Sequence, residues 1–270
     1  MSHSFEPAPK KIHLAGIDPG DTDGIHKEGE ALKKLEEWKE ELYNLHYLMY
    51  ADNRRGLLVI LQGIDASGKD GAVRYLASAL NPQGTNIYSF KKPSDLEIDH
   101  DYLWRIHSAC PGRGEVSIFN RSHYEEVTVL KVHPNLLDNE FLPPEIRNSP
   151  DIWKQRYRQI RDFERMLVEN GTVVLKFFLH ISRNEQEKRF EERMRDPRKH
   201  WKFSAQDLAE RQYWDDYMRV FEEMIEETSA DVAPWYIVPA DRKWFRNYKI
   251  ASVVVDTLSG LKMEYPKLKV

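Results

Sequence analysis

The feature that most constrains this chain is a short apolar run joined directly to a glycine-rich loop. Gly56 precedes Leu57–Leu61, and the loop Gly63–Asp70 follows. An all-apolar run bounded in this way predicts a strand buried on both faces, as strands of parallel sheets are. The loop fits G-x-x-x-x-G-K, in which inward-turned backbone N–H groups and a lysine hold phosphate oxygens. A helical pattern over Ala72–Leu80 supplies the helix that such a loop requires.

Further along the chain, extended apolar runs alternate with helical patterns, which predicts βαβ units and a parallel sheet with helices on both faces. The other predicted strands are Thr85–Phe90, Glu115–Phe119, Thr172–Leu179 and Trp235–Val238. The other predicted helices are Lys27–Tyr50, His100–Ala109, Trp153–Glu169, Glu185–Met194, Leu208–Glu227 and Trp244–Leu261. The expected fold class is therefore α/β, with a parallel sheet between two layers of helices.

The expected organisation is an N-terminal arm followed by one catalytic domain. Residues 1–26 lack periodicity and are rich in Pro, Gly, Asp and Ser, which is typical of a tail or extended arm. Residues 27–270 form the expected single domain. The Pro-rich, aperiodic stretch Leu130–Pro150 is expected to be a long loop or an inserted short helix.

Composition excludes several classes of protein. The chain has 270 residues, with 40 Lys and Arg against 44 Asp and Glu, a formal net charge of −4 that argues against a general nucleic-acid binder. Cys110 is the only cysteine, so no intrachain disulfide and no cysteine-based zinc site are expected. The polar segment Met1–Lys11 does not fit a secretory signal, and no apolar run is long enough to span a membrane. A cytoplasmic protein with no membrane partner is the expectation.

The phosphate loop departs from the common pattern at its last position. Asp70 stands where nucleotide-hydrolysing proteins have the Ser or Thr that binds magnesium. Because a carboxylate repels phosphates unless a metal intervenes, Asp65, Asp70 or both are candidates to hold Mg²⁺ directly or through water. The candidate phosphate contacts in this loop are Gly63, Ala66, Ser67, Gly68, Lys69 and Asp70. The alternative, a chance glycine-rich turn, fits the strand and helix context less well.

A second polar motif follows the predicted strand Glu115–Phe119. Asn120 and Arg121 come at its end, where the carboxyl edge of a parallel sheet holds ligands. An arginine there can neutralise charge on a transferring phosphoryl group. The alternative is a polar strand end with Arg121 in a surface ion pair.

Together these motifs resemble the second family of polyphosphate kinases, over nearly the whole chain beyond the arm. The residues that carry the resemblance are Gly63–Gly71, Asp101–Arg105, Phe119–Glu125, Trp201–Phe203 and Ala233–Tyr236. The family moves phosphoryl groups between inorganic polyphosphate and nucleotides with Mg²⁺, for which Mn²⁺ is a substitute. Asn120-Arg121-Ser122-His123-Tyr124-Glu125 is similar to its third class, which phosphorylates both nucleoside mono- and diphosphates.

The resemblance implies roles for individual residues. Asp65 would hold magnesium, Lys69 the phosphates and Arg121 the transferring group. Asn120 and Glu125 would mark the subclass and lie near the acceptor. The resemblance also implies a three-layer P-loop kinase-like fold with a helical lid at about 182–207. It further implies a homo-oligomer, a dimer or a tetramer.

The segment Ser182–Phe203 is strongly basic but interleaved with acids. Most of its cations are expected to form i,i+4 pairs such as Glu185–Arg189 on a solvated helix. Arg189 also matches a catalytic lid arginine of the family. Further candidates for polyphosphate contact are Arg193, Lys199 and Lys202, with Arg74 and Lys131 as weaker ones. For His123 and Trp201, substrate contact and a structural role are both open.

Three functions are left open by the residues. The first is a phosphotransferase with polyphosphate as donor and AMP or ADP as acceptor. The second is an ATP-dependent kinase of a nucleotide or small metabolite, which Asp70 and the basic lid fit less well. The third is a polyanion-binding protein without catalysis, which the net charge and the intact loop disfavour.

Overall fold

The computed structural model describes residues 5–268, and its centre is a five-stranded sheet. The strand order is β2-β3-β1-β4-β5, and every neighbouring pair is parallel. The strands are β1 (Gly56–Gln62), β2 (Thr85–Ser89), β3 (Val116–Asn120), β4 (Thr172–His180) and β5 (Trp235–Pro239). All five predicted strands are confirmed, as is the α/β fold with a parallel sheet.

The central strand β1 positions the site. All seven of its residues are buried, with β3 on one side and β4 on the other. In register, Leu61 pairs with Asn120 and Gln62 with Phe178. The phosphate loop and the Asn120–Arg121 motif therefore leave the same edge of the sheet, as the parallel topology requires.

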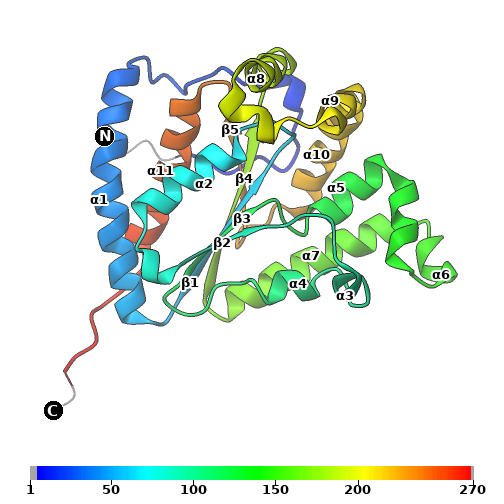
Figure 1. Cartoon of the computed structure of the whole chain (residues 1–270). Helices are drawn as coiled ribbons and strands as arrows, with labels where there is room; N and C mark the ends of the chain where they lie inside the picture. The colour runs from blue at the N-terminus through cyan, green and yellow to red at the C-terminus, as the bar shows by residue number, and fades with distance from the viewer. Residues whose placement is uncertain (1–4, 269–270) are drawn as a thin grey trace.

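Helices cover both faces of the sheet, which gives three layers (Figure 1). The first face is covered by α1 (Glu28–Asp52), α2 (Lys69–Ala79) and α11 (Lys243–Gly260). The second face is covered by α4 (Trp104–His107), α5 (Glu125–Val132), α7 (Ile152–Glu169) and α10 (Trp214–Thr228). Successive side chains of β1 point to opposite faces of the sheet, which explains the two cores: Leu57, Val59 and Leu61 pack on the first face, and Leu58 and Ile60 on the second.

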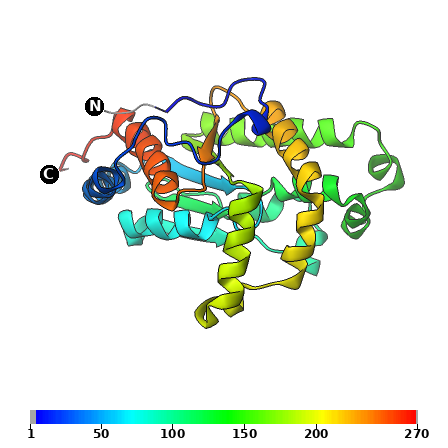
Figure 2. The same cartoon turned by 90° about the horizontal axis from the view of Figure 1, so that it is seen from above.

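The remaining helices lie at the periphery. They are α3 (Asp95–Ile98), α6 (Pro144–Arg147), α8 (Arg183–Arg195) and α9 (Ala205–Glu210), with short 3-10 turns at Leu14–Gly16, Pro82–Gly84, Pro134–Glu140, Pro197–Lys202 and Arg211–Tyr213. Seen from above, α8 projects away from the sheet together with the chain that leads to α10 (Figure 2). This projecting part, residues 182–213, contains the segment at about 182–207 that was predicted to be a lid, and it is called the lid segment below.

Two helix predictions need correction, and the stretch Leu130–Pro150 contains short helices, one of the two alternatives that its sequence allowed. The predicted helix Leu208–Glu227 is interrupted by the 3-10 turn Arg211–Tyr213, which separates α9 from α10. The predicted helix His100–Ala109 shrinks to α4, and Leu130–Pro150 begins inside α5 and then contains a 3-10 helix and α6. Apart from α10, these helices and turns have three to eight residues, too few for apolar positions to repeat at helical spacing.

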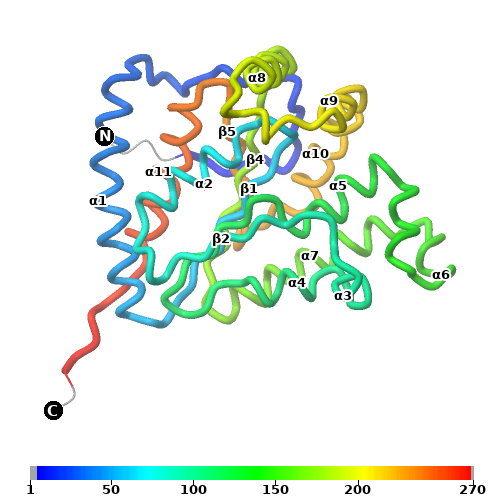
Figure 3. The backbone as a smooth tube through the Cα atoms, viewed as in Figure 1, coloured from blue at the N-terminus to red at the C-terminus, as the bar shows by residue number. Residues whose placement is uncertain are grey.

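The described part of the expected arm is packed against the domain. The amide of Ala8 donates to the carbonyl of Trp235, and Leu14 is 1% exposed in the second core. Asp23 accepts from Lys249 of α11 at 2.9 Å. The segment thus runs across the top of the molecule from α1 toward α10 (Figure 3). Residues 1–4 of the expected arm and residues 269–270 of the expected domain lie outside the described residues.

A charged cluster is buried beneath the second face of the sheet. Lys176 of β4 is fully buried, and its ammonium group donates to Glu164 at 2.6 Å, to the Tyr124 hydroxyl at 3.0 Å and to the carbonyl of Thr228 at 2.7 Å. Tyr124 donates to the other oxygen of Glu164 at 2.7 Å. The cluster ties β4, α7 and α10 to the residue that precedes α5.

No helix within residues 5–268 is long and apolar enough to cross a bilayer.

Candidate active site

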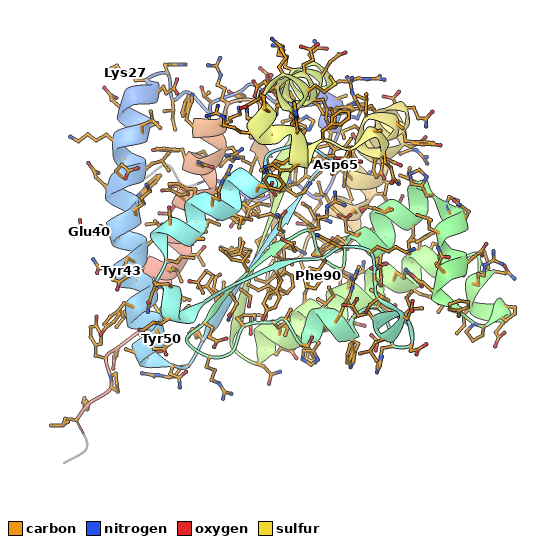
Figure 4. All side chains as sticks on the ribbon, in the orientation of Figure 1. Lys27, Glu40, Tyr43, Tyr50, Asp65 and Phe90 are labelled. Atoms are coloured by element: carbon orange, nitrogen blue, oxygen red, sulfur yellow. The ribbon has the colours of Figure 1, made fainter. Side chains whose placement is uncertain are left out.

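The phosphate loop wraps the start of α2, with Asp65 at the upper edge of the sheet (Figure 4). Lys69 is 8% exposed, and its ammonium group lies over the loop, 2.5 Å from the carbonyl oxygen of Gly63 and 3.1 Å from that of Ile64. Burial, together with the positive charge of Arg121, lowers the pKa of Lys69. Gly68 has φ +107°, a conformation that L side chains rarely adopt, so glycine is required where the loop enters the helix. The loop is therefore formed as its sequence predicts.

Arg121 is held directly opposite the loop by two carboxylates. One of its η nitrogens lies 2.6 Å from Asp65 and the other 3.2 Å from Glu125. Glu125, followed by Asp65, raises the pKa of Arg121 well above its usual value despite partial burial. Arg121 also has φ +66°, a costly conformation for a non-glycine residue. Gln62 donates to Glu125 at 3.1 Å, which fixes the second carboxylate.

Asp70 is not free to face a metal on its own. Asn120 donates to one of its oxygens at 2.9 Å, and Lys202 of the lid segment donates to the other at 2.5 Å. Partial burial alone would raise its pKa, but these two hydrogen bonds lower the pKa of Asp70 to about 2. Asn120, Asp70 and Lys202 thus connect β3, α2 and the lid segment.

Arg189 lies at the junction between the lid segment and the loop. It is 6% exposed, and its guanidinium donates to the backbone carbonyls of Ala66, Ser67, Ala240 and Asp241 at 2.7–3.0 Å. The predicted Glu185–Arg189 pair is also present, at 2.9 Å. In this structure Arg189 therefore fastens α8 to the loop.

The carboxylate oxygens at the site are of the type that Mg²⁺ prefers. Asp65, Glu125 and Asp207 line a small cavity of about 40 Å³ together with Arg121, and the charge of Asp65 contributes, after burial, to a raised pKa of Asp207. Within residues 5–268, no three His, Cys, Asp or Glu side chains are grouped so that they could hold a metal by themselves. This arrangement suits Mg²⁺, which is usually held by one or two carboxylates, substrate phosphates and water.

The other predicted phosphate contacts are divided between the site and its surroundings. Arg193 lies within the lid segment, 3.6 Å from Asp207, and Lys199 pairs with Glu192 at 3.4 Å. Arg74 is exposed on α2, one turn beyond Asp70. Lys131 forms an ion pair with Glu223 of α10 and does not line the cavity at Asp65 and Arg121.

The structure distinguishes the two roles, substrate contact or a structural role, that the sequence left open for His123 and Trp201. His123 is fully buried, 3.5 Å from Glu164, and does not reach the site. Trp201 is 78% exposed on the lid segment, with Lys202 over its ring, so core packing is the wrong interpretation for it.

A larger cavity lies on the other side of α5. Its volume is about 450 Å³, and Tyr102 and Arg105 of the Asp101–Arg105 motif line it together with Glu126. Arg105 donates to Glu126 at 2.9 Å and to the carbonyl of Lys91 at 2.8 Å. This motif therefore organises the chain that follows β2.

Several residues at the site were not predicted from the sequence. Gln62 directly follows the apolar run Leu57–Leu61 and is the last residue of β1. A polar residue at the end of a buried strand could have indicated a role at the site. Gln186 donates to the carbonyl of Asp65 at 2.9 Å, and Asp207 and Tyr217 line the small cavity. Arg246 of α11 lies against Gly68 and Gly71. No local pattern marks Arg246, because it comes from a segment 178 residues after Gly68.

Comparisons with known proteins agree with this geometry. The model of the polyphosphate kinase 2 (PPK2) family matches residues 25–266. An ADP-polyphosphate phosphotransferase of Rhodopseudomonas palustris is 49% identical over 228 residues, which cover 84% of this chain and 79% of that protein. An AMP/ADP-polyphosphate phosphotransferase of Meiothermus ruber is 43% identical over 258 residues, which cover 95% and 92%. The crystal structure of polyphosphate kinase 2 from Arthrobacter aurescens TC1 superposes with a TM-score of 0.90 at 38% identity, covering 98% of this chain and 91% of that chain.

Proposed function

The chain belongs to the polyphosphate kinase 2 family, and we propose that it transfers the terminal phosphoryl group of inorganic polyphosphate to AMP and ADP, giving ADP and ATP. The observation that carries the proposal is the pairing of an intact phosphate loop with Arg121, which Asp65 and Glu125 hold opposite it. The relative from Meiothermus ruber, whose name includes both acceptors, matches over 95% of this chain.

The reaction needs positioning more than it needs a base. A phosphate oxygen of the acceptor attacks the terminal phosphorus, and the bond from that phosphorus to the bridging oxygen of the donor breaks, leaving a chain shorter by one unit. The attacking oxygen is already anionic near neutral pH, so no strong general base is required. Lys69 and Arg121 neutralise charge on the transferring group, as arginine and lysine do in other phosphoryl transfers. The reaction is reversible because one phosphoanhydride replaces another.

Mg²⁺ is part of the proposal. Asp65 is the residue that we propose holds it, with Asp70 as second candidate once Lys202 has moved to substrate. When bound, the ion would neutralise phosphate charge in the transferring group. Mn²⁺ accepts the same oxygen ligands and is expected to substitute.

The first test is a donor assay. The purified protein is incubated with Mg²⁺, long-chain polyphosphate and AMP in the absence of ATP, and nucleotides are resolved over time. ADP followed by ATP is the expected result, and EDTA is expected to stop both steps. ATP formed only from added ADP would narrow the acceptor, whereas transfer from ATP alone to another substrate would replace the proposal with an ordinary kinase.

We also propose a homo-oligomer formed through the outer face of α1. Leu32, Tyr43, Tyr47 and Tyr50 are each 43–48% exposed and recur at helical spacing, so they form one apolar stripe, with Tyr43 and Tyr50 on the outer helix α1 in Figure 4. Light scattering after size exclusion is expected to give at least twice the mass of the chain. The variant Tyr43→Glu/Tyr47→Glu is expected to be monomeric and the control Lys33→Glu to be unchanged. A monomeric wild type would contradict the proposal.

A further inference from the structure

Arg246 is a buried cation at the phosphate loop that the mechanism above does not use. It lies on the first turn of α11, is 4% exposed, and its guanidinium rests against Gly68 and Gly71. Arg189 lies on the same glycine, since a side chain at Gly68 would come within 3.3 Å of it. Two guanidinium groups therefore flank the entrance to α2.

Like Lys69 of the loop, Arg246 has no carboxylate at ion-pair distance within residues 5–268. Its Nε and one η nitrogen donate to the side-chain oxygen of Asn247 at 3.1 and 2.9 Å, and no ion pair involves it. Arg121, Arg189 and Lys202, in contrast, each pair with an acid. Burial, with the positive charges of Arg189 and Arg74, lowers the pKa of Arg246 to about 10. A buried positive charge beside two others is costly unless an anion joins it.

Gly71 gives the arrangement a sequence signature. It lies in the first turn of α2, where glycine is a poor helix former. A Cβ at this position would lie 2.7 Å from an η nitrogen of Arg246. The absence of a side chain at Gly71 thus lets the guanidinium lie flat on the backbone that begins the helix, with its polar edge toward the loop.

We propose that Arg246, with Arg74 beyond it, binds an internal phosphate of the donor chain, so that the polymer runs from the loop over the first turn of α2 toward α11. This inference rests on the proposed function, because it requires a donor with phosphates beyond the reacting one. A guanidinium fork matches phosphate oxygens, and the first-turn amides of α2 add to the attraction. The donor thereby supplies the anion that Arg246 lacks.

The test compares variants that change Arg246 by different routes. Arg246→Gln removes the charge, Arg246→Lys keeps the charge without the fork, and Gly71→Ala displaces the guanidinium with a better helix former. Arg165→Gln, an exposed arginine on α7 across the sheet, is the matched control. The measurements are KM for long-chain polyphosphate, KM for AMP and ADP, kcat, and the melting temperature of each variant.

Arg246→Gln is expected to raise KM for long-chain polyphosphate by about 10- to 100-fold, the loss of a charged hydrogen bond, with kcat and the acceptor KM within about twofold. Gly71→Ala is expected to raise the donor KM in the same way without loss of melting temperature, and Arg246→Lys to give an intermediate value. If Arg246→Gln raised the KM for AMP or ADP as much as the KM for polyphosphate, Arg246 would not be specific to the donor and the inference would be overturned. A polyphosphate KM for Arg246→Gln equal to that of Arg165→Gln would also overturn it. If wild type transfers nothing from polyphosphate, the proposed function itself has failed.

Discussion

Arg121→Ala is expected to lower kcat for transfer from polyphosphate to AMP by about 10³-fold or more, the range measured for arginines that stabilise phosphoryl-transfer transition states. Two ion pairs, to Asp65 and Glu125, and a left-handed backbone set the position of this guanidinium. A cation from another position of the chain would not reach the same place. Saturating steady-state assays measure the effect. Arg121→Lys is expected to recover only a small part, since it keeps the charge and loses the fork.

The loss should be catalytic and not structural. The Arg121 side chain is 40% exposed, so its ion pairs contribute little to stability, and the melting temperature is expected to stay close to that of wild type. Arg219→Ala is the matched control, because Arg219 also pairs with an aspartate, Asp216, but on the exposed face of α10. If Arg121→Ala kept a tenth of wild-type kcat, Arg121 would have no direct role in the transfer.

The largest effect on stability is expected at Lys176, far from substrate. Lys176→Met leaves Glu164 buried without its cation, which is expected to cost about 3–5 kcal/mol of the free energy of unfolding. Urea unfolding at neutral pH measures this loss. The double variant Lys176→Met/Glu164→Leu removes both charges and is expected to regain most of it. A single variant within about 1 kcal/mol of wild type would show that water or a shift in protonation compensates the charge.

The same variant should have an altered pH dependence. In the wild type, burial would raise the pKa of Glu164, but Lys176 and His123 lower it below its usual value. Glu164 therefore stabilises the fold above the unfolded pKa, and this contribution is lost as the pH falls. Without Lys176, burial raises the pKa of Glu164, so the sign reverses and stability is lost as the pH rises through the raised value. The gap between variant and wild type is expected to narrow as the pH is lowered toward 5.

The parts of the fold that local pattern determines were predictable from the sequence. β1 could be located because a bounded run of five apolar residues has few other conformations in a folded chain, and the loop that follows has a fixed spacing. Asn120 and Arg121 could be assigned to the same edge because parallel strands bring their carboxyl ends together. The placement of Asp65 and Arg121 at one cavity, with Lys69 over the same loop, follows from those two facts.

The parts that depend on distant packing were not predictable. The partners of Lys176 lie on two helices and on the residue before a third, and nothing in its own strand indicates them. Lys131 was a reasonable phosphate candidate by charge, but the turn of α5 directs it to Glu223. Arg246 reaches the loop only because α11 packs beside α2. In each case the contact joins segments that are far apart in the sequence, and the pattern of neither segment indicates the other.

The bridge between Lys202 and Asp70 makes substrate entry an ion exchange. The carboxylate of Asp70 already pairs with Lys202, the lysine that the lid segment would offer to the donor. An incoming phosphate would therefore have to displace this carboxylate. The net gain in attraction at Lys202 is therefore smaller than its charge suggests, and the shortened chain can be displaced by the same internal counterion when it leaves. If Lys202 binds the donor as proposed, Asp70, the residue that departs from the usual loop, would compete with the polymer for this lysine and so limit how tightly a highly charged substrate binds.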